Sequence, residues 1–137
     1  MENEEYKSLI ENQRDKNNQL LGKFEEKLKA DGLSDKTVFN HLSNLDFYIN
    51  RFLLYEEIIA PKDGIRNVGY FFEEWFPRKA MWSNPASVNG TIIALKKFYK
   101  YLLLLDFITK SEYSGLLETI KDSKATWISY YQPNNDG

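Results

Sequence analysis

The strongest constraint on the fold is a helical repeat of apolar residues between residues 34 and 55. Alternating steps of four and three residues separate five apolar side chains, which places them on one face of an α-helix. They are Val38, Leu42, Leu45, Ile49 and Phe52. No segment shows the sustained alternation of apolar and polar residues that a half-buried strand requires. The sequence therefore predicts an all-α protein.

Capping residues and helix breakers divide the chain into further helices. Three N-termini are marked by side chains that can accept free backbone N–H groups of a first turn, namely Ser34, Asn84 before Pro85, and Thr109 three residues before Glu112. Gly32 and Pro77 are predicted helix ends. The expected helices cover residues 20–30, 34–55, about 71–76, 84–105 and 109–121. They predict a compact bundle of four to five helices.

Length and composition fit one globular domain. The chain has 137 residues, of which 42% are hydrophobic and 28% are charged. We expect a helical domain over residues 18–124, preceded at 1–17 by a polar tail or frayed helix and followed at 125–137 by a tail. The first residues have neither the basic start nor the apolar run of a secretory signal, so we expect no secretory leader. No apolar run approaches the roughly 20 residues of a membrane span. The expectation is a cytoplasmic protein with no membrane partner.

Residue types that enzymes commonly use are scarce. There is no cysteine, and His41 is the only histidine, which argues against thiol catalysis, a histidine-based triad and a histidine-rich metal site. We interpret His41 as a packed or surface histidine. Acidic doublets such as Glu73-Glu74 do not share a helix face, and no glycine-rich phosphate loop is present. We expect no enzymatic activity, no cofactor, no metal and no small-molecule substrate.

The charge is unevenly distributed along the chain. The sequence holds 18 lysines and arginines against 20 carboxylates, for a net charge of −2. Between Trp75 and Leu105 there is no carboxylate, and this window carries five cations: Arg78, Lys79, Lys96, Lys97 and Lys100. The local field is therefore positive although the chain is acidic. Such lysines also commonly occupy the solvent side of an amphipathic helix.

Two polar helix faces and one aromatic cluster are candidate surfaces. Helical spacing puts Asn89, Ile93, Lys96 and Lys100 on one face of the helix at 84–105, with Lys97 beside them. A second face, on the helix at 34–55, carries Lys36, Asn40, Ser43 and Asn44. Lysine, amide and hydroxyl groups can meet DNA phosphates and base edges. The aromatic cluster is read as core packing, with a partner-binding patch as the alternative: Tyr70, Phe71, Phe72, Trp75, Phe76, Met81 and Trp82.

Two segments resemble the N-terminal SAM-like, or core-binding, domain of phage integrases and other tyrosine recombinases. Ser34 and Thr37 match the Ser-x-x-Thr that opens the second helix of that family. The run Leu95-Lys-Lys-Phe-Tyr-Lys-Tyr-Leu102, followed by Ile108, matches the Leu-Lys-x-Phe-Tyr-x-Tyr-Leu run and isoleucine that close its fourth helix. The resemblance covers about residues 18–122 in matching order.

The resemblance implies a bundle that grips duplex DNA. By position, it implies DNA contacts from Lys36, Asn40, Ser43, Asn44, Asn89, Lys96, Lys97 and Lys100. The family's DNA integration and recombination chemistry lies in a separate catalytic domain, for which only 13 residues remain after Lys124. Two interpretations of the chain stay open. It is either a stand-alone relative of the DNA-binding module, which would act with a recombinase or another protein partner in trans, or a fragment of a longer protein. A second function stays open, a helical protein-interaction or structural domain that kept the fold without DNA binding.

Overall fold

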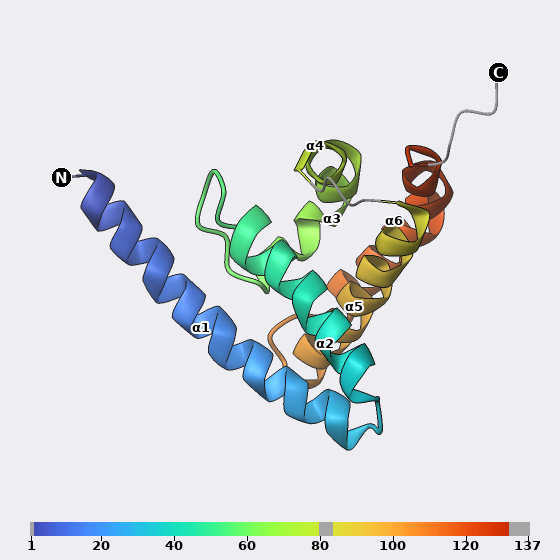
Figure 1. Ribbon diagram of the computed structural model, residues 1–137, viewed down its shortest axis with the longest axis horizontal. Coiled ribbons are helices and arrows are strands. Elements are labelled where there is room, and N and C mark those ends of the chain that lie inside the picture. Colours follow the sequence, from blue (N-terminus) through green and yellow to red (C-terminus); the bar gives the residue numbers. More distant parts are fainter. Residues whose placement is uncertain (1, 80–83, 132–137) are drawn as a thin grey trace. The chain divides into compact units, whose positions relative to one another are not determined.

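The computed structural model describes residues 2–79 and 84–131 of the chain (Figure 1). Within these residues the protein is all-helical and contains no strand, as the periodicity predicts. The described part holds five continuous helical segments, which fall into two units at residues 1–64 and 65–137. None of the described helices combines the length and apolarity that a bilayer crossing needs.

The first unit is built from two helical segments. One is α1 (Glu2–Ala30), and the other is α2 (Asp35–Asp46), which continues without a break into a π-helical segment, η1 (Phe47–Phe52). Helix α1 packs against both α2 and η1. The predicted stripe is confirmed, because Val38, Leu45, Ile49 and Phe52 are buried and Leu42 is half-buried.

The turn between α1 and α2 has the predicted capping chemistry. Gly32 adopts a φ of 88°, a left-handed conformation that ends α1. The N–H groups of Gly32 and Leu33 donate to the carbonyls of Lys29 and Leu28, at 3.0 and 3.2 Å, which is the Schellman pattern. The Oγ of Ser34 then accepts the N–H of Thr37 at 3.2 Å and begins α2. Both predicted helix boundaries are confirmed.

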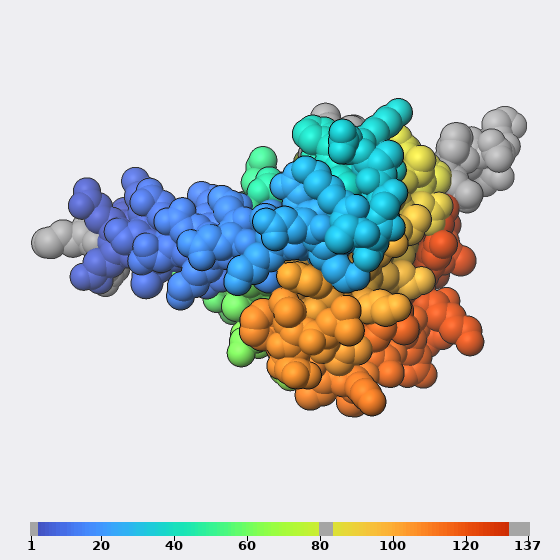
Figure 2. All heavy atoms as spheres, turned by 90° about the horizontal axis from the view of Figure 1, so that it is seen from below, coloured from blue at the N-terminus to red at the C-terminus, as the bar shows by residue number. Residues whose placement is uncertain are grey.

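Helix α1 begins much earlier than the sequence predicts. Residues 1–17, predicted as a polar tail or a frayed helix, are helical from Glu2 and continue without a break into the helix predicted from Leu20 (Figure 1). The atoms of this helix are blue in Figure 2. Its first half is rich in glutamate and lysine, whose intrinsic helix propensity is high even where no apolar stripe is present. Further along, Asn17 is buried and bonded to η1. Apolar periodicity alone does not detect either effect.

The second unit contains three helical segments. A 3₁₀ turn (η2, Asp63–Asn67) at the boundary of the units leads into α3 (Val68–Tyr70), the π-helical η3 (Phe71–Trp75) and α4 (Phe76–Lys79). Helices α5 (Pro85–Leu104) and α6 (Lys110–Ser129) follow, and α6 packs against both α5 and α3. Both predicted N-caps are present: the N–H of Ser87 donates to Asn84 Oδ1 at 2.9 Å, and that of Glu112 donates to Thr109 Oγ1 at 3.1 Å. The predicted capping box at Thr109 and Glu112 is confirmed, and Asn84 forms a second one with Ser87, which was not predicted.

Two helix ends in the second unit were predicted wrongly. Pro77 does not end its helix, because α4 continues to Lys79. The preceding turn is π-helical, with the Phe76 N–H bonded to the Phe71 carbonyl, and this wider turn accommodates a proline that lacks an N–H. Helix α6 ends at Ser129 and not near Lys121, so the predicted tail from residue 125 is helical at its start.

Aromatic packing explains the extension of α6. Trp127 is fully buried, and its ring stacks on Phe72 with centroids 4.7 Å apart. Its Nε1–H donates to the Glu73 carboxylate at 3.3 Å. Phe71, Phe72, Trp75 and Phe76 are buried too, which confirms the core interpretation of the aromatic cluster, whereas Tyr70 is half exposed. Met81 and Trp82 lie outside the described residues.

Candidate nucleic-acid interface

One side of α5 is half-buried at Asn89 and exposed from Ile93 to the end of the helix. Its other side is buried through residues such as Ile92, Leu95 and Phe98. At 3.6 residues per turn, the open residues fall within about 100° of the helix circumference. We call this surface the α5 stripe, and it consists of Asn89, Ile93, Lys96, Lys97, Lys100 and Leu104. The structure thus brings the four predicted α5 residues together on one face.

The cations of the α5 stripe are not neutralised by neighbouring carboxylates. Lys96, Lys97 and Lys100 are exposed, and none of them forms an ion pair with the residues that the structure describes. Four other cations do have carboxylate partners, in the pairs Lys27–Asp31, Lys29–Glu25, Arg66–Glu112 and Arg78–Glu74. The positive charge of the α5 stripe is therefore available to an anionic ligand.

The two units differ in the sign of their charge. The sequence of the second unit carries nine lysines and arginines against seven carboxylates, whereas that of the first carries nine against thirteen. The net charge of −2 thus hides a basic unit, which contains α5, and an acidic unit, which contains α2. Within its own unit, the charge around the α5 stripe has the sign that favours an anion.

The predicted α2 face is present but weaker. Lys36, Asn40 and Ser43 are exposed and Asn44 is half-buried, and helical spacing puts all four on one side of α2. The face holds a single cation, and it belongs to the acidic unit. The structure therefore gathers the eight predicted residues into two groups of four, one in each unit.

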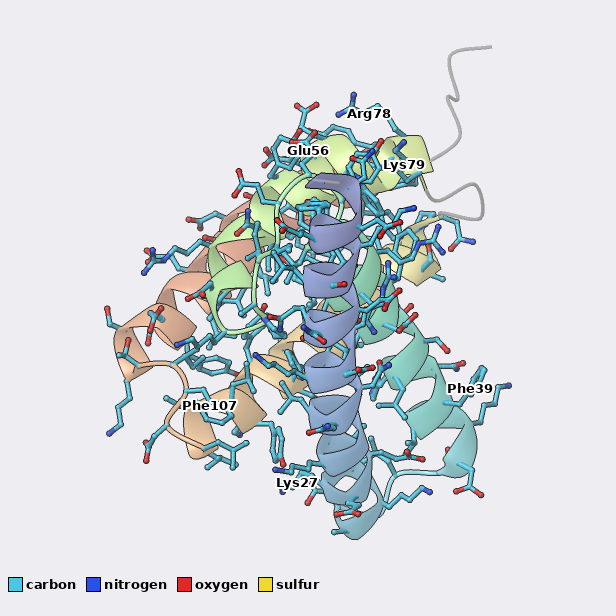
Figure 3. All side chains as sticks on the ribbon, turned by 90° about the vertical axis from the view of Figure 1, so that its left-hand side faces the viewer. Lys27, Phe39, Glu56, Arg78, Lys79 and Phe107 are labelled. Atoms are coloured by element: carbon cyan, nitrogen blue, oxygen red, sulfur yellow. The ribbon has the colours of Figure 1, made fainter. Side chains whose placement is uncertain are left out.

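Several exposed apolar side chains were not predicted. Leu104, Leu105 and Phe107 lie at the turn between α5 and α6 and are 64%, 39% and 53% exposed. Phe107 is labelled at this turn in Figure 3. Phe39 points away from α2 and is 68% exposed. In the sequence, residues 101–105 form a hydrophobic run that does not distinguish buried from exposed positions. The one signal that the later residues are exposed is that the helical apolar stripe of α5 ends at Leu102.

Three further features bear on whether the chain holds a chemical site: His41, the carboxylates and a surface hollow. His41 is buried on α2, in keeping with a packed histidine. Across residues 2–79 and 84–131, no three histidine or carboxylate side chains gather as metal ligands. A hollow of about 270 Å³ in the second unit has an apolar floor that includes Val68 and Leu116. At its edge Arg66 and Glu112 pair at 3.8 Å.

Comparison with known proteins adds no further assignment. No protein-family profile, curated protein or solved structure matches the chain. The chemistry of the α5 stripe, with three exposed lysines beside an amide and two apolar side chains, therefore carries the functional argument. Such a surface suits a polyanion that also offers apolar contacts.

Proposed function

We propose that the protein is a non-catalytic DNA-binding module of the SAM-like type found at the N-terminus of tyrosine recombinases. The observation that carries this proposal is the α5 stripe, whose three unpaired lysines belong to the basic unit of an acidic chain. Duplex DNA is the proposed ligand. The α2 face supplies a second, weaker contact through Lys36 and its polar neighbours.

The chemistry of the α5 stripe suits the two kinds of contact that DNA offers. Lysines that neutralise phosphates release condensed counterions, and this release drives binding at low salt. The amide of Asn89 can pair with a base edge, and Ile93, which is 47% exposed, can pack against a thymine methyl group. Phosphate contacts would position the helix and the two other side chains would read the groove.

The test is fluorescence anisotropy of a labelled duplex titrated with the protein at several salt concentrations, with a junction DNA alongside. About five phosphate contacts give a log–log salt slope of about −4 to −5. The triple variant Lys96→Ala, Lys97→Ala and Lys100→Ala should weaken binding and bring the slope about 3 closer to zero. An unchanged affinity and slope in this variant would rule out the α5 stripe as the DNA contact.

A matched control separates a specific face from a general loss of charge. Lys110, Lys121 and Lys124 lie on α6 in the same unit, are exposed, and form no ion pair with the described residues. Replacing all three with alanine removes the same charge from another helix. If both triple variants lose DNA affinity equally, DNA binding depends on the net charge of the protein and not on the position of the lysines in the α5 stripe.

A second function, a helical protein-interaction domain, is favoured by the apolar turn between α5 and α6. Leu104, Leu105 and Phe107 expose apolar surface there, and clustered exposed apolar residues mark partner-binding sites. Under this function, the protein shows no DNA binding even at about 50 mM salt, where the electrostatic contribution is strong. Replacing Leu104 and Phe107 with serine then disrupts the partner complex, whereas the α5 lysine variant retains it.

A further inference from the structure

Helix α5 begins without charge, although its exposed side later carries three lysines. No charged residue precedes Lys96 in this helix. In the uncharged part, Ala86 and Ile93 are exposed and Asn89 is half-buried. At 3.6 residues per turn, Ala86 and Ile93 lie within about 20° of one line along the helix, and Asn89 lies beside that line. We call these three residues the neutral end of α5.

The amide of Asn89 is the polar group that the neutral end offers to a ligand. It forms no hydrogen bond with the residues that the structure describes. The two neighbouring hydroxyl groups are already engaged within the helix. Ser87 Oγ donates to the Asn84 carbonyl at 2.9 Å, and Thr91 Oγ1 donates to the Ser87 carbonyl at 2.8 Å. The hydroxyls therefore stabilise the start of α5, whereas the Asn89 amide faces a ligand with its donors and its acceptor.

The chemistry of the neutral end matches one type of base pair. An asparagine amide can form two hydrogen bonds with N6 and N7 of adenine, and apolar side chains pack against the 5-methyl group of thymine. Guanine is most often read by arginine or lysine, and neither residue type occurs in α5 before Lys96. The amide of Asn89 and the apolar side chains of Ala86 and Ile93 therefore both favour an A·T pair.

The dimensions of α5 suit the same interpretation. The major groove is wide enough to hold an α-helix, and recognition helices of the helix-turn-helix type contact base edges through their N-terminal residues. Helical rise separates Ala86 and Ile93 by about 10 Å, which is the length of about three base-pair steps. Lys100 lies about 10 Å further along α5. The neutral end can thus face base edges while the lysines face phosphates.

We propose that the neutral end of α5 reads A·T base pairs in the major groove, with Asn89 on adenine and with Ile93 and Ala86 on thymine methyl groups. This inference rests on the proposed function and specifies its ligand. The lysines of the α5 stripe bind the phosphates of any sequence. Base preference and salt dependence therefore come from different parts of the same helix.

Replacing thymine with uracil in the duplex tests the apolar contact. This change removes only the 5-methyl group, which lies in the major groove. Anisotropy titrations at about 50 mM salt should show that the natural sequence binds an A·T-rich duplex more tightly than a G·C-rich duplex of equal length. Uracil should weaken binding by about fourfold for each methyl group that is contacted. Ile93→Ser should bring the ratio of the two affinities closer to one by about fourfold.

Leu104→Ser is the matched control for Ile93→Ser. It removes an exposed apolar side chain from the other end of the α5 stripe, so it should leave the difference between thymine and uracil duplexes unchanged. Circular dichroism of both variants verifies that the helices remain folded.

Substitution of Asn89 tests the amide contact. Asn89→Ala should reduce the preference for the A·T-rich over the G·C-rich duplex by about fivefold or more, because a paired amide discriminates between bases. Lys100→Ala is the contrasting variant. It should weaken binding to both duplexes alike and bring the salt slope about 1 closer to zero.

The outcomes separate this inference from the proposed function. Salt-dependent binding with equal affinity for thymine and uracil duplexes, or with no preference for A·T pairs, overturns the inference and leaves the DNA-binding function standing. An A·T preference that survives both uracil and Asn89→Ala would come from the minor groove or from DNA shape, and it overturns the inference too. Absence of any DNA binding at about 50 mM salt instead overturns the proposed function itself.

Discussion

The side-chain amide of Asn17 donates a hydrogen bond to the side-chain oxygen of Asn50, 2.9 Å away, and both residues are buried. The same amide donates to the carbonyl of Ile49 at 3.2 Å. The amide of Asn50 in turn donates to the side-chain oxygens of Asn18 and Asp46, at 3.0 and 2.7 Å. Ile49 and Asn50 belong to the π-helical segment η1, and the Asn50 carbonyl also accepts a hydrogen bond from Arg14 of α1. The network therefore fixes α1 against the π-helical turn of its partner helix.

Removing the amide of Asn17 should destabilise the first unit. Asn17→Ala leaves the oxygen of Asn50 and the carbonyl of Ile49 without this donor, and an unmade buried hydrogen bond costs about 1–3 kcal/mol. Asn12→Ala is the control, because Asn12 is exposed on the same helix and gains the same helix propensity. Urea denaturation followed by circular dichroism should show a lower midpoint for Asn17→Ala only. Equal midpoints would mean that the network contributes no net stability.

The sequence predicted the features that repeat or that carry local chemistry. The apolar stripes of α2 and α5, the caps at Ser34, Asn84 and Thr109, and the exposed lysines of α5 all follow from spacing of 3.6 residues per turn and from side-chain oxygens at helix starts. It did not predict the long start of α1. An asparagine such as Asn17 in a polar stretch has no local feature that distinguishes a buried position from an exposed one.

Tertiary packing explains the other differences. Helix α6 extends beyond its predicted end because Trp127 stacks on Phe72 and donates a hydrogen bond to Glu73. Both partners lie more than fifty positions away in the chain. The exposure of Leu104 and Phe107 follows from where α5 ends, which the hydrophobic run does not reveal. The candidate lysine face itself was predictable because it needs only one helix. Its contact with DNA stays a prediction.

Two glycines of the first unit should respond in opposite directions to the same substitution. Gly32 has a φ of 88°, a conformation that costs an alanine about 1 kcal/mol or more. Gly22 lies inside α1, and a methyl group built there meets nothing within 4 Å. Gly22→Ala should therefore stabilise by about 0.5–1 kcal/mol and Gly32→Ala should destabilise. Thermal melts of the two variants give the signs, and shifts in the same direction would contradict the assigned end of α1.

A charge at the centre of the α2 stripe should unfold the first unit. Leu45 is completely buried, so Leu45→Asp places an unpaired carboxylate in the core and should cost about 3 kcal/mol or more. Asn40→Asp, on the exposed side of the same helix, is the control and should shift stability by less than about 0.5 kcal/mol. Thermal unfolding followed by circular dichroism compares them. Similar melting temperatures would show that the face of α2 is assigned wrongly.

Alkaline pH should destabilise the second unit through Tyr131. Its ring packs edge-on against Phe76, and burial, with a smaller contribution from Tyr130, raises the pKa of Tyr131 from 10.0 to about 12. Between pH 10 and 12 the unfolded tyrosine loses its proton while the folded one keeps it, so the free energy of unfolding falls as pH rises. The Tyr131 hydroxyl is buried without a hydrogen-bond partner among the described residues, so Tyr131→Phe should be at least as stable as the natural sequence at pH 8 and should lose less stability by pH 11. Denaturant titrations at both pH values measure this, and an equal alkaline loss in the two proteins would exclude Tyr131 as its source.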